Sequence, residues 1–392
     1  MQTLKMTEKL YYSDSHLFSF HAAVLACTGS EDGGFLAVLD RTAFFPEGGG
    51  QRADTGTIAG IRVTHVFEKD GVIFHRCSGP VDACPDALCE VDREQRLRRM
   101  QNHSGEHVLS GLIYRRFGYS NVGFHMGERC MTIDFSGELS DSDLAGIEKA
   151  ANEKIRDNIP VTAYFPSPEE LAATEYRSKL DLTENVRLVK IDGCDICACC
   201  APHVSATGEI GSIKILSSMR HRGGTRIEAV CGMDALDHFR LKQENAEKIS
   251  ALLSAKQDEI GSAVERLLRL SEEQKLKIAA LSMDCASLKA ESVADTEGNI
   301  CLFEDLLDDI AVRELVNRLS GKCRGMAGVF SGDDQTGYRY IIGSSNADLR
   351  SCAKAINAGI EGKGGGSASM IQGHSASCAQ KIRDFFNAFK LN

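Results

Sequence analysis

Two short motifs in this sequence carry histidine and cysteine at a spacing that metal sites use. His103 and His107 lie four residues apart, which on a helix places both imidazoles on one face and within reach of a single ion. Cys199 and His203 repeat that spacing in a segment that contains Pro202, so we expect this pair in a loop. Three imidazole nitrogens and one thiolate suit a tetrahedral site for a borderline-soft ion, and one Zn2+ fits that set best.

Each motif also has a simpler explanation. A lone His-x3-His pair is more often a surface coincidence than a metal site. Cys194, Cys197 and Cys200 surround the second motif and offer a cysteine-rich structural site without either helical histidine. Glu106 precedes His107 directly, so we expect its side chain to point off the ligand face, in a supporting or structural role. The residues alone assign no catalytic base.

Composition places these motifs in a folded protein of several domains. The chain has 392 residues, which exceeds the roughly 250–300 at which one hydrophobic core stops growing. Fifteen cysteines in a long chain fit reduced thiols better than a disulfide scaffold. Residues 1–20 mix charged and apolar side chains and lack the apolar stretch of a signal peptide or membrane span. We therefore expect a cytoplasmic protein with no membrane contact.

The order of the expected elements predicts an α+β multidomain fold. Residues 1–92 contain short strand-like runs, Leu10–Tyr12 among them, separated by glycine-rich turns, and predict a β-barrel-like domain. Residues 93–234 mix helices with strands and form the expected α+β domain around the zinc motifs. One helix there covers about 142–156, with Ser140 among the residues able to cap it.

The remaining sequence changes character twice. Residues 235–292 are rich in Glu, Lys, Gln, Leu and Ala without proline, and predict a long helical linker or coiled coil. Gly261 and Gln274 are the positions at which that helix would break into a hairpin. Residues 293–392 alternate between strand and helix patterns and predict a C-terminal α/β domain.

Charge sets limits on the partners of this chain. A formal net charge of −10 argues against a protein that coats nucleic acid without selectivity. It leaves room for a local basic surface, for which the arginine-rich run at 93–99 and the basic run at 220–226 are candidates. Ordinary solvated surface charge explains either run equally well.

The segments around both motifs resemble the editing domain shared by alanyl-tRNA synthetases and free-standing alanyl-tRNA editing proteins of the AlaX type. The matching stretches in that domain are 98–107, 199–204, 207–215 and 224–230. Residues 42–51 resemble the glycine-rich loop that precedes the editing core, and 362–366 with 370–373 resemble the C-terminal domain of the synthetases. Nothing resembles the aminoacylation domain, so we expect the long, free-standing form of editing protein.

This resemblance implies a function and a site. The implied activity is zinc-dependent ester hydrolysis that removes wrongly attached serine, or glycine, from tRNA(Ala). The implied zinc ligands are His103, His107, Cys199 and His203, and the implied substrate contacts are Thr42, Gly48, Gly49, Gly50 and Gln51. The implied tRNA contacts are Arg98, Arg99, Lys363, Gly364, Gly365 and Gly366. A homodimer through the helical or C-terminal region is a further expectation.

Three questions stay open from the sequence. The family motif usually reads Cys-Gly-Gly-Thr-His, and Pro202 stands where threonine is expected, which leaves the preference between serine and glycine undecided. Zinc can activate water or position the substrate, and because four protein ligands would close the site, either one ligand is loose or zinc positions the substrate. The alternative functions are editing of another misacylated tRNA, such as Ser-tRNA(Thr), and non-catalytic RNA binding by a zinc-stabilised protein.

Overall fold

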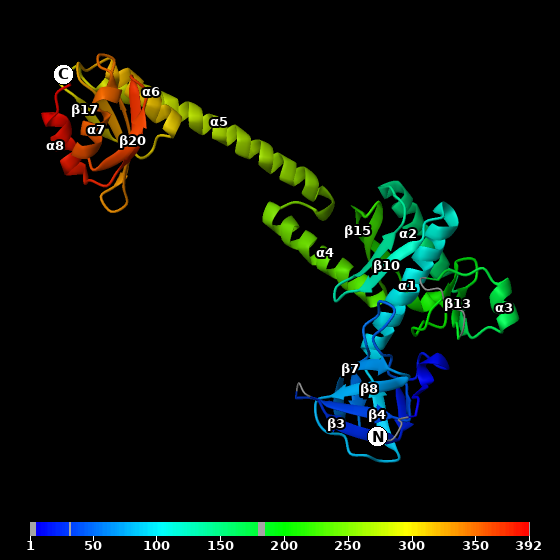
Figure 1. The fold of residues 1–392 in the computed structure, drawn as a ribbon. Coiled ribbons are helices and arrows are strands. Elements are labelled where there is room, and N and C mark those ends of the chain that lie inside the picture. Colours follow the sequence, from blue (N-terminus) through cyan, green and yellow to red (C-terminus); the bar gives the residue numbers. More distant parts are fainter. Residues whose placement is uncertain (1–4, 31–32, 179–184, 392) are drawn as a thin grey trace. The chain divides into compact units, whose positions relative to one another are not determined.

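The computed structural model describes residues 5–30, 33–178 and 185–391 and divides the chain into two compact units. Unit 1 covers Met1–Asn245 and unit 2 covers Ala246–Asn392. Both units combine helices with multistranded sheets, so the expected mixed α and β character is confirmed (Figure 1). The finer four-domain layout stays a prediction.

The first part of unit 1 is an antiparallel sheet that curls on itself. Its seven strands run in the order β2-β9-β6-β7-β8-β4-β3. They are β2 (Ser19–Ala22), β3 (Val24–Gly29), β4 (Phe35–Leu39), β6 (Gly56–Ile58), β7 (Ile61–Lys69), β8 (Val72–Cys77) and β9 (Ala87–Val91). The two edge strands, β2 and β3, are separated only by Ala23, so the sheet must curve until its edges meet around a buried core.

A short segment before this sheet differs from the expectation. Glu8–Lys9 (β1) pairs in parallel with Arg41–Thr42 (β5), but Leu10–Tyr12 forms a 3-10 helix and not a strand. The backbone N–H groups of Ser13 and Asp14 both donate to the Leu10 carbonyl, which closes a turn and ends the pairing. This turn buries Tyr11, whose ring packs edge-on against Phe45.

Helix α1 (Arg93–Phe117) is the central element of the second part of unit 1. The Asp92 side chain caps its first turn, and Gly118, at φ 73°, ends it. Arg96 of α1 is fully buried and pairs with Asp54, which attaches the helix to the curled sheet. The helix therefore begins inside the sheet's polar network and runs on through the second core.

Two smaller sheets and a second helix surround α1. One sheet has the order β10-β11-β16-β15, from Asn121–Met126, Met131–Phe135, Gly224–Cys231 and Ile213–His221. The other has the order β12-β13-β14, from Val161–Tyr164, Leu188–Ile191 and Asp195–Ala198. Helix α2 (Asp141–Arg156) begins at a Ser140–Asp143 capping box, close to the predicted start. The short elements are α3 (Pro168–Ala173) and a 3-10 turn at Thr207–Ile210.

The predicted long helix is broken, but not where the sequence suggested. Helix α4 (Gly232–Leu253) ends at Ser254, which adopts φ 49°, and α5 (Ile260–Ser292) follows after a 3-10 turn at Gln257–Glu259. The expectation of a break at Gly261 or Gln274 is wrong, because both lie inside α5. Glutamine is a good helix former, so Gln274 interrupts the hydrophobic repeat without interrupting the helix.

Unit 2 continues with a five-stranded sheet in the order β17-β18-β19-β21-β20. Its strands are Ile300–Phe303, Ala327–Asp333, Gly337–Gly343, Met370–Ser375 and Gly362–Gly366, respectively. Helices α6 (Asp309–Ser320), α7 (Leu349–Gly359) and α8 (Ala379–Ala388) complete the unit. Among the described residues, no helix combines the length and apolar character needed to cross a membrane.

Candidate metal centre and substrate pocket

Four side chains from two distant segments converge in unit 1. His103, His107, Cys199 and His203 place their ligand atoms within 4.8 Å of one another. The Cys199 Sγ lies 3.5 Å from the Nε2 of His103 and 3.4 Å from the Nε2 of His203. The two histidines of α1 come from successive turns, and the other two residues come from the loop after β14. The structure therefore brings together all four residues predicted as zinc ligands.

The outer nitrogens of the three histidines are held by other side chains. The Nδ1 of His103 lies 2.8 Å from Gln51 Oε1, and the Nδ1 of His107 lies 2.9 Å from Asp195 Oδ2. Both oxygens are acceptors, so each Nδ1 carries a proton and each Nε2 is the nitrogen that can bind a metal ion. The Nδ1 of His203 contacts the Ser104 hydroxyl at 3.0 Å. This is the arrangement that orients histidine for metal binding.

Asp195 is itself fixed by an arginine. The Nε and one terminal nitrogen of Arg177 each donate to a different oxygen of Asp195, both at 2.7 Å. The Asp195 carboxylate is 1% exposed, so the fork neutralises a buried charge and fixes its orientation. The chain Arg177–Asp195–His107 thus sets the direction in which His107 presents Nε2.

The protonation states also fit a metal ion. Burial opposes the Cys199 thiolate, but His103 and His203 outweigh it and hold the pKa of Cys199 well below its usual value. Burial lowers the pKa of His203 to about 3, so this imidazole is neutral. At His107, burial works against the charged form, yet Asp195 and Cys199 raise its pKa well above the usual value. The raised pKa of His107 reflects the negative charges of Asp195 and Cys199 beside it, and a bound cation would take the place of the proton on its Nε2.

The cysteine-rich alternative has less support. Cys197 forms a second close group with His107 and Asp195, beside the first and sharing His107 with it. Cys194 is buried and Cys200 is exposed. Neither joins a metal-capable group within the described residues. The donor set with the right number and kind of ligands for zinc is the one that contains three histidines and Cys199.

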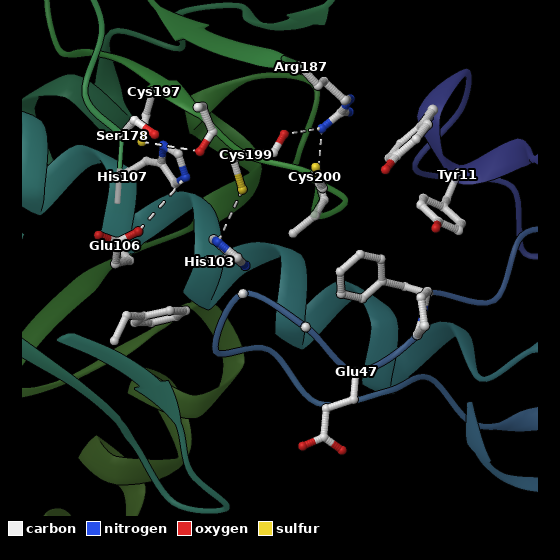
Figure 2. Close-up of a pocket in the computed structure, with 18 of the residues that line it drawn as sticks. Tyr11, Glu47, His103, Glu106, His107, Ser178, Arg187, Cys197, Cys199 and Cys200 are labelled. Atoms are coloured by element: carbon white, nitrogen blue, oxygen red, sulfur yellow. Dashed lines mark hydrogen bonds and ion pairs between the residues drawn. The ribbon is translucent and has the colours of Figure 1, made fainter. Parts of the chain in front are cut away.

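A pocket of about 310 Å3 extends from the metal group. Figure 2 shows His103, His107 and Cys199 on one side of it and Tyr11 and Arg187 on the other. Gly48 and Gly49 of the predicted glycine-rich loop line the pocket. Glu106 also lines it, and its Oε2 lies 3.9 Å from His107 Nε2, so the expectation that this side chain points away from the ligands is wrong. Its other oxygen accepts from Ser110 and Asn121, which draws the carboxylate toward the site.

The other residues predicted from the glycine-rich loop occupy different positions. Gly50, at φ 83°, packs against β10, where an added Cβ would lie 2.5 Å from the Phe124 carbonyl oxygen. Gln51 lies behind His103 and not in the pocket wall, and its Nε2 has no partner among the described residues. Thr42 is fully buried in the curled sheet, where its hydroxyl contacts His75 Nε2 at 2.8 Å. The structure therefore does not bring Thr42 to the pocket.

The predicted tRNA contacts lie in both units. Arg98 forms ion pairs with Asp234 and Asp237, and Arg99 donates to the Ala53 carbonyl and to Asp54. Both arginines therefore hold elements of unit 1 together. Lys363, Gly364, Gly365 and Gly366 are exposed on β20, one of the two edge strands of the sheet in unit 2.

Several residues of the site were not predicted from the sequence. Tyr11 and Arg187 line the pocket, and Asp195 and Arg177 support His107. Asp195 stands four residues before Cys199, so a search for a carboxylate near the ligand motif would have found it. Tyr11 lies far from either motif in sequence and offered no such signal.

Comparison with known proteins agrees with this site. The family described as the threonyl and alanyl tRNA synthetase second additional domain matches residues 186–228, which include Cys199 and His203. The alanine–tRNA ligase of Pyrococcus abyssi is 30% identical over 397 residues, covering 95% of this chain and 42% of the ligase. That of Methanobrevibacter smithii is 28% identical over 404 residues, covering 95% and 44%.

A shorter relative matches along its own length as well. The alanyl-tRNA editing protein Aarsd1 of Danio rerio is 26% identical over 387 residues, covering 94% of this chain and 94% of that protein. The chain spans less than half the length of the two ligases. The resemblance drawn from the motifs is therefore confirmed: nearly all of this chain is similar to an alanyl-tRNA editing protein and to the corresponding part of alanine–tRNA ligases.

Proposed function

We propose that this chain is a trans-editing hydrolase that deacylates mischarged tRNA(Ala), with Ser-tRNA(Ala) as its main substrate and Gly-tRNA(Ala) as a second one. The observation that carries the proposal is the convergence of His103, His107, Cys199 and His203 at one end of a pocket. The similarity to Aarsd1 supports the same activity, since that protein is named for alanyl-tRNA editing.

The metal that these four ligands suit best is one Zn2+ ion. When bound, zinc supplies a Lewis acid that can polarise an ester carbonyl or a water molecule. Other residues of the chain fix the orientation and the tautomers of the ligand side chains. Gln51 and Asp195 fix the tautomers of His103 and His107, and Arg177 fixes Asp195. Such outer contacts keep the ligands at their positions without reorganisation during the reaction.

Two polar groups lie near the metal end of the pocket. The Gln51 amide nitrogen is buried behind His103 with no partner among the described residues, and it reaches the seryl hydroxyl only through a shift of the glycine-rich loop when the substrate binds. A donor of this kind favours serine over alanine, because alanine would leave it unpaired. The Glu106 carboxylate lies in the pocket wall next to His107 and can accept a hydrogen bond from the substrate or from water.

The remaining expectations belong to this proposal. The tRNA is bound through exposed basic and glycine-rich surface, including Lys363 and Gly364–Gly366 of unit 2. The protein acts in the cytoplasm, and two copies associate through the helical or C-terminal region. The apolar side chains exposed on α5, such as Leu268 and Leu276, support that association.

The test is deacylation of purified Ser-tRNA(Ala), Gly-tRNA(Ala), Ala-tRNA(Ala) and Ser-tRNA(Thr), each with and without a zinc chelator. We expect hydrolysis of the first two, little of Ala-tRNA(Ala), and loss of activity with chelator that added zinc restores. The matched family also includes threonyl-tRNA synthetases, so preferential hydrolysis of Ser-tRNA(Thr) would instead assign this chain to editing of tRNA(Thr). A protein that binds tRNA tightly but leaves every ester intact is a binding protein and not a hydrolase.

A further inference from the structure

Unit 1 contains a second pocket, of about 240 Å3, in which several arginines gather. The arginines that line it are Arg52, Arg98, Arg99 and Arg129. We call this cavity the arginine pocket. Only two carboxylates, those of Glu128 and Asp234, line it as well. The lining is therefore positive within a chain whose formal net charge is −10, which favours an anionic ligand at this place.

Two of these arginines are available to a ligand. Arg129 is exposed on the turn between β10 and β11, and it makes no ion pair with any residue that the structure describes. Arg52 pairs with Glu128 at 3.2 Å, but the Glu128 side chain is 80% exposed. An exposed pair of this kind contributes little free energy, because water and salt screen it. Arg52 can therefore exchange Glu128 for a stronger acceptor.

Arg99 adds positive charge that the protein only partly compensates. It is the least exposed of the three arginines that form ion pairs around the pocket, at 12%. Its acidic partner, Asp54, is shared with the fully buried Arg96. Burial and the like charges of Arg96 and Arg52 lower the pKa of Arg99. An anion in the arginine pocket would stabilise the charged form of Arg99.

The arginine pocket and the pocket at the metal group follow each other along one face of α1. Gln95, Arg99 and Asn102 line the arginine pocket, and Glu106 lines the pocket at the metal group. Residues at these spacings of three and four lie on one stripe of a helix. About one helical turn therefore separates the linings of the two pockets on this side.

The glycine-rich loop passes between the two pockets. Gly49 lines the pocket at the metal group, and Arg52 lines the arginine pocket. Along β10, Phe124 lines the first pocket and Met126 lines the second. The Met126 N–H donates to the Gly50 carbonyl at 2.9 Å, which joins the loop to the strand at this point. A ligand strand that leaves the metal group across this loop therefore reaches the arginine pocket next.

We propose that the arginine pocket binds a phosphate group of the RNA strand that carries the ester, with Arg52 and Arg129 as the direct contacts. This inference rests on the proposed function, because that function places the acylated end of a tRNA at the metal group. The strand continues from that end through phosphodiester links, each of which carries one negative charge. Guanidinium groups bind phosphate through paired N–H donors, so two arginines fit one link. A free phosphate ion offers the same oxygens, and the experiments below distinguish the two sources.

The first experiment measures how a short RNA with the 3′ sequence of tRNA(Ala) binds to the full zinc-loaded chain, by fluorescence anisotropy at several salt concentrations. The variants are Arg52→Gln and Arg129→Gln. The matched control is Arg156→Gln, because Arg156 is 76% exposed on α2 and lines neither pocket. We expect each variant to bind about tenfold more weakly, as for one lost charge-assisted hydrogen bond, and the control to bind like the unmodified chain.

The salt dependence of this binding reports the phosphate contact directly. In each variant, the slope of log affinity against log salt concentration should become shallower by about 0.7, the value for one phosphate of a single strand. The slope of Arg156→Gln should stay that of the unmodified chain. Equal slopes in all four proteins would overturn the proposal.

A second set of probes identifies the source of the phosphate. Each RNA in this set has the same sequence but carries an uncharged methylphosphonate at one link. We expect one of these replacements to weaken binding to the unmodified chain about tenfold, and to weaken binding to Arg129→Gln much less, because that contact is already lost. Inorganic phosphate should compete only weakly. Replacements that cost the same in both proteins, or inorganic phosphate that binds more tightly than the RNA, would overturn the proposal.

Deacylation separates this inference from the proposed function. The substrates are Ser-tRNA(Ala) and the seryl ester of adenosine, which contains no phosphate. The ratio of kcat/KM for the tRNA to kcat/KM for the small ester should fall about tenfold in Arg129→Gln, mainly through KM. An unchanged ratio removes the phosphate contact but keeps the hydrolase. Hydrolysis of neither substrate removes the hydrolase, and the RNA binding measurements still test the arginine pocket.

Discussion

Unit 1 contains two groups of buried polar side chains that differ in how completely they satisfy one another. Inside the curled sheet, Phe44 N–H donates to the Thr42 hydroxyl, Thr42 contacts His75 Nε2, and His75 Nδ1 contacts the Ala37 carbonyl. Every polar atom in this series of contacts has a partner. At the metal group, by contrast, the outer nitrogens are paired, while three Nε2 atoms and one thiolate converge on one point with Glu106 beside them.

This contrast separates a structural role from a functional one. A closed set of hydrogen bonds stabilises the fold and leaves nothing to bind a ligand. Buried polar atoms that lack partners are costly, and such an open group is retained where a ligand or metal ion supplies the missing partner. Thr42 and Gln51 lie only nine residues apart, yet Thr42 belongs to the fully paired group and Gln51 supports the metal group. We therefore expect substitutions in the first group to lower the free energy of unfolding, and substitutions in the second group to lower metal binding and activity.

The largest effect is expected from Cys199→Ala. It removes the thiolate, so zinc binding and Ser-tRNA(Ala) hydrolysis should fall by more than the 10–100-fold typical of losing an outer contact. Zinc content after dialysis and the deacylation rate measure both effects. Cys200→Ala is the matched control, because Cys200 is exposed and adjacent. Zinc lost from the control but kept by Cys199→Ala would place the metal among other cysteines.

His75, which belongs to the fully paired group, should make the free energy of unfolding depend on pH. Burial lowers the pKa of His75 to about 4, below its usual value near 6.5 in an unfolded chain. The folded state therefore binds fewer protons, and the contribution of His75 is complete above about pH 6.5 and is lost as pH falls toward about 4. Its size is up to about 3 kcal/mol.

Urea unfolding at several pH values tests this, with His75→Gln as the comparison. The free energy of unfolding of the unmodified protein should fall more steeply on acidification than that of His75→Gln. Taking the difference between the two proteins cancels the titration of the metal ligands, which both share. Parallel curves would show that His75 does not titrate as its burial requires.

Asp195→Asn tests the outer contact of the open group. Asparagine keeps the shape, but it removes the charge that Arg177 pairs with and weakens the hold on His107. Zinc affinity should fall about 10–100-fold, measured by competition with a coloured chelator. Asp192→Asn, which alters an exposed ion pair with Lys190 in the same region, should leave the affinity unchanged. Equal losses in both variants would assign the effect to the local backbone.

The smallest effect on activity is expected from Thr42→Val. The loss of the hydroxyl leaves His75 and Phe44 N–H short of a partner, which should lower the free energy of unfolding by about 1–3 kcal/mol. Deacylation per folded molecule should stay nearly unchanged, whereas Gln51→Ala should reduce it. A fall in kcat/KM for Thr42→Val as large as that for Gln51→Ala would show that Thr42 contributes to the substrate site.

The group of four residues that could hold a metal ion could be predicted because residue type and local spacing carry that signal. His103 with His107, and Cys199 with His203, each form a pair that is readable within five residues. The polarity of Thr42 gave no such guide, because whether a threonine faces a pocket or a sheet interior depends on strand pairing. Tyr11 and Arg187 meet across the pocket only after residues far apart in sequence have packed. Long-range placement of this kind is set by the tertiary fold and leaves no local pattern.

The two halves of the metal group are separated by 96 residues between His103 and Cys199. During synthesis, α1 and the curled sheet emerge from the ribosome well before the loop that supplies Cys199 and His203. The early segment must therefore keep its two imidazoles ready, with Gln51 already available to His103 but Asp195 still to come. The group that could hold a metal is in this way completed late in synthesis, and a chain truncated before residue 203 would leave the ribosome without all four of its side chains.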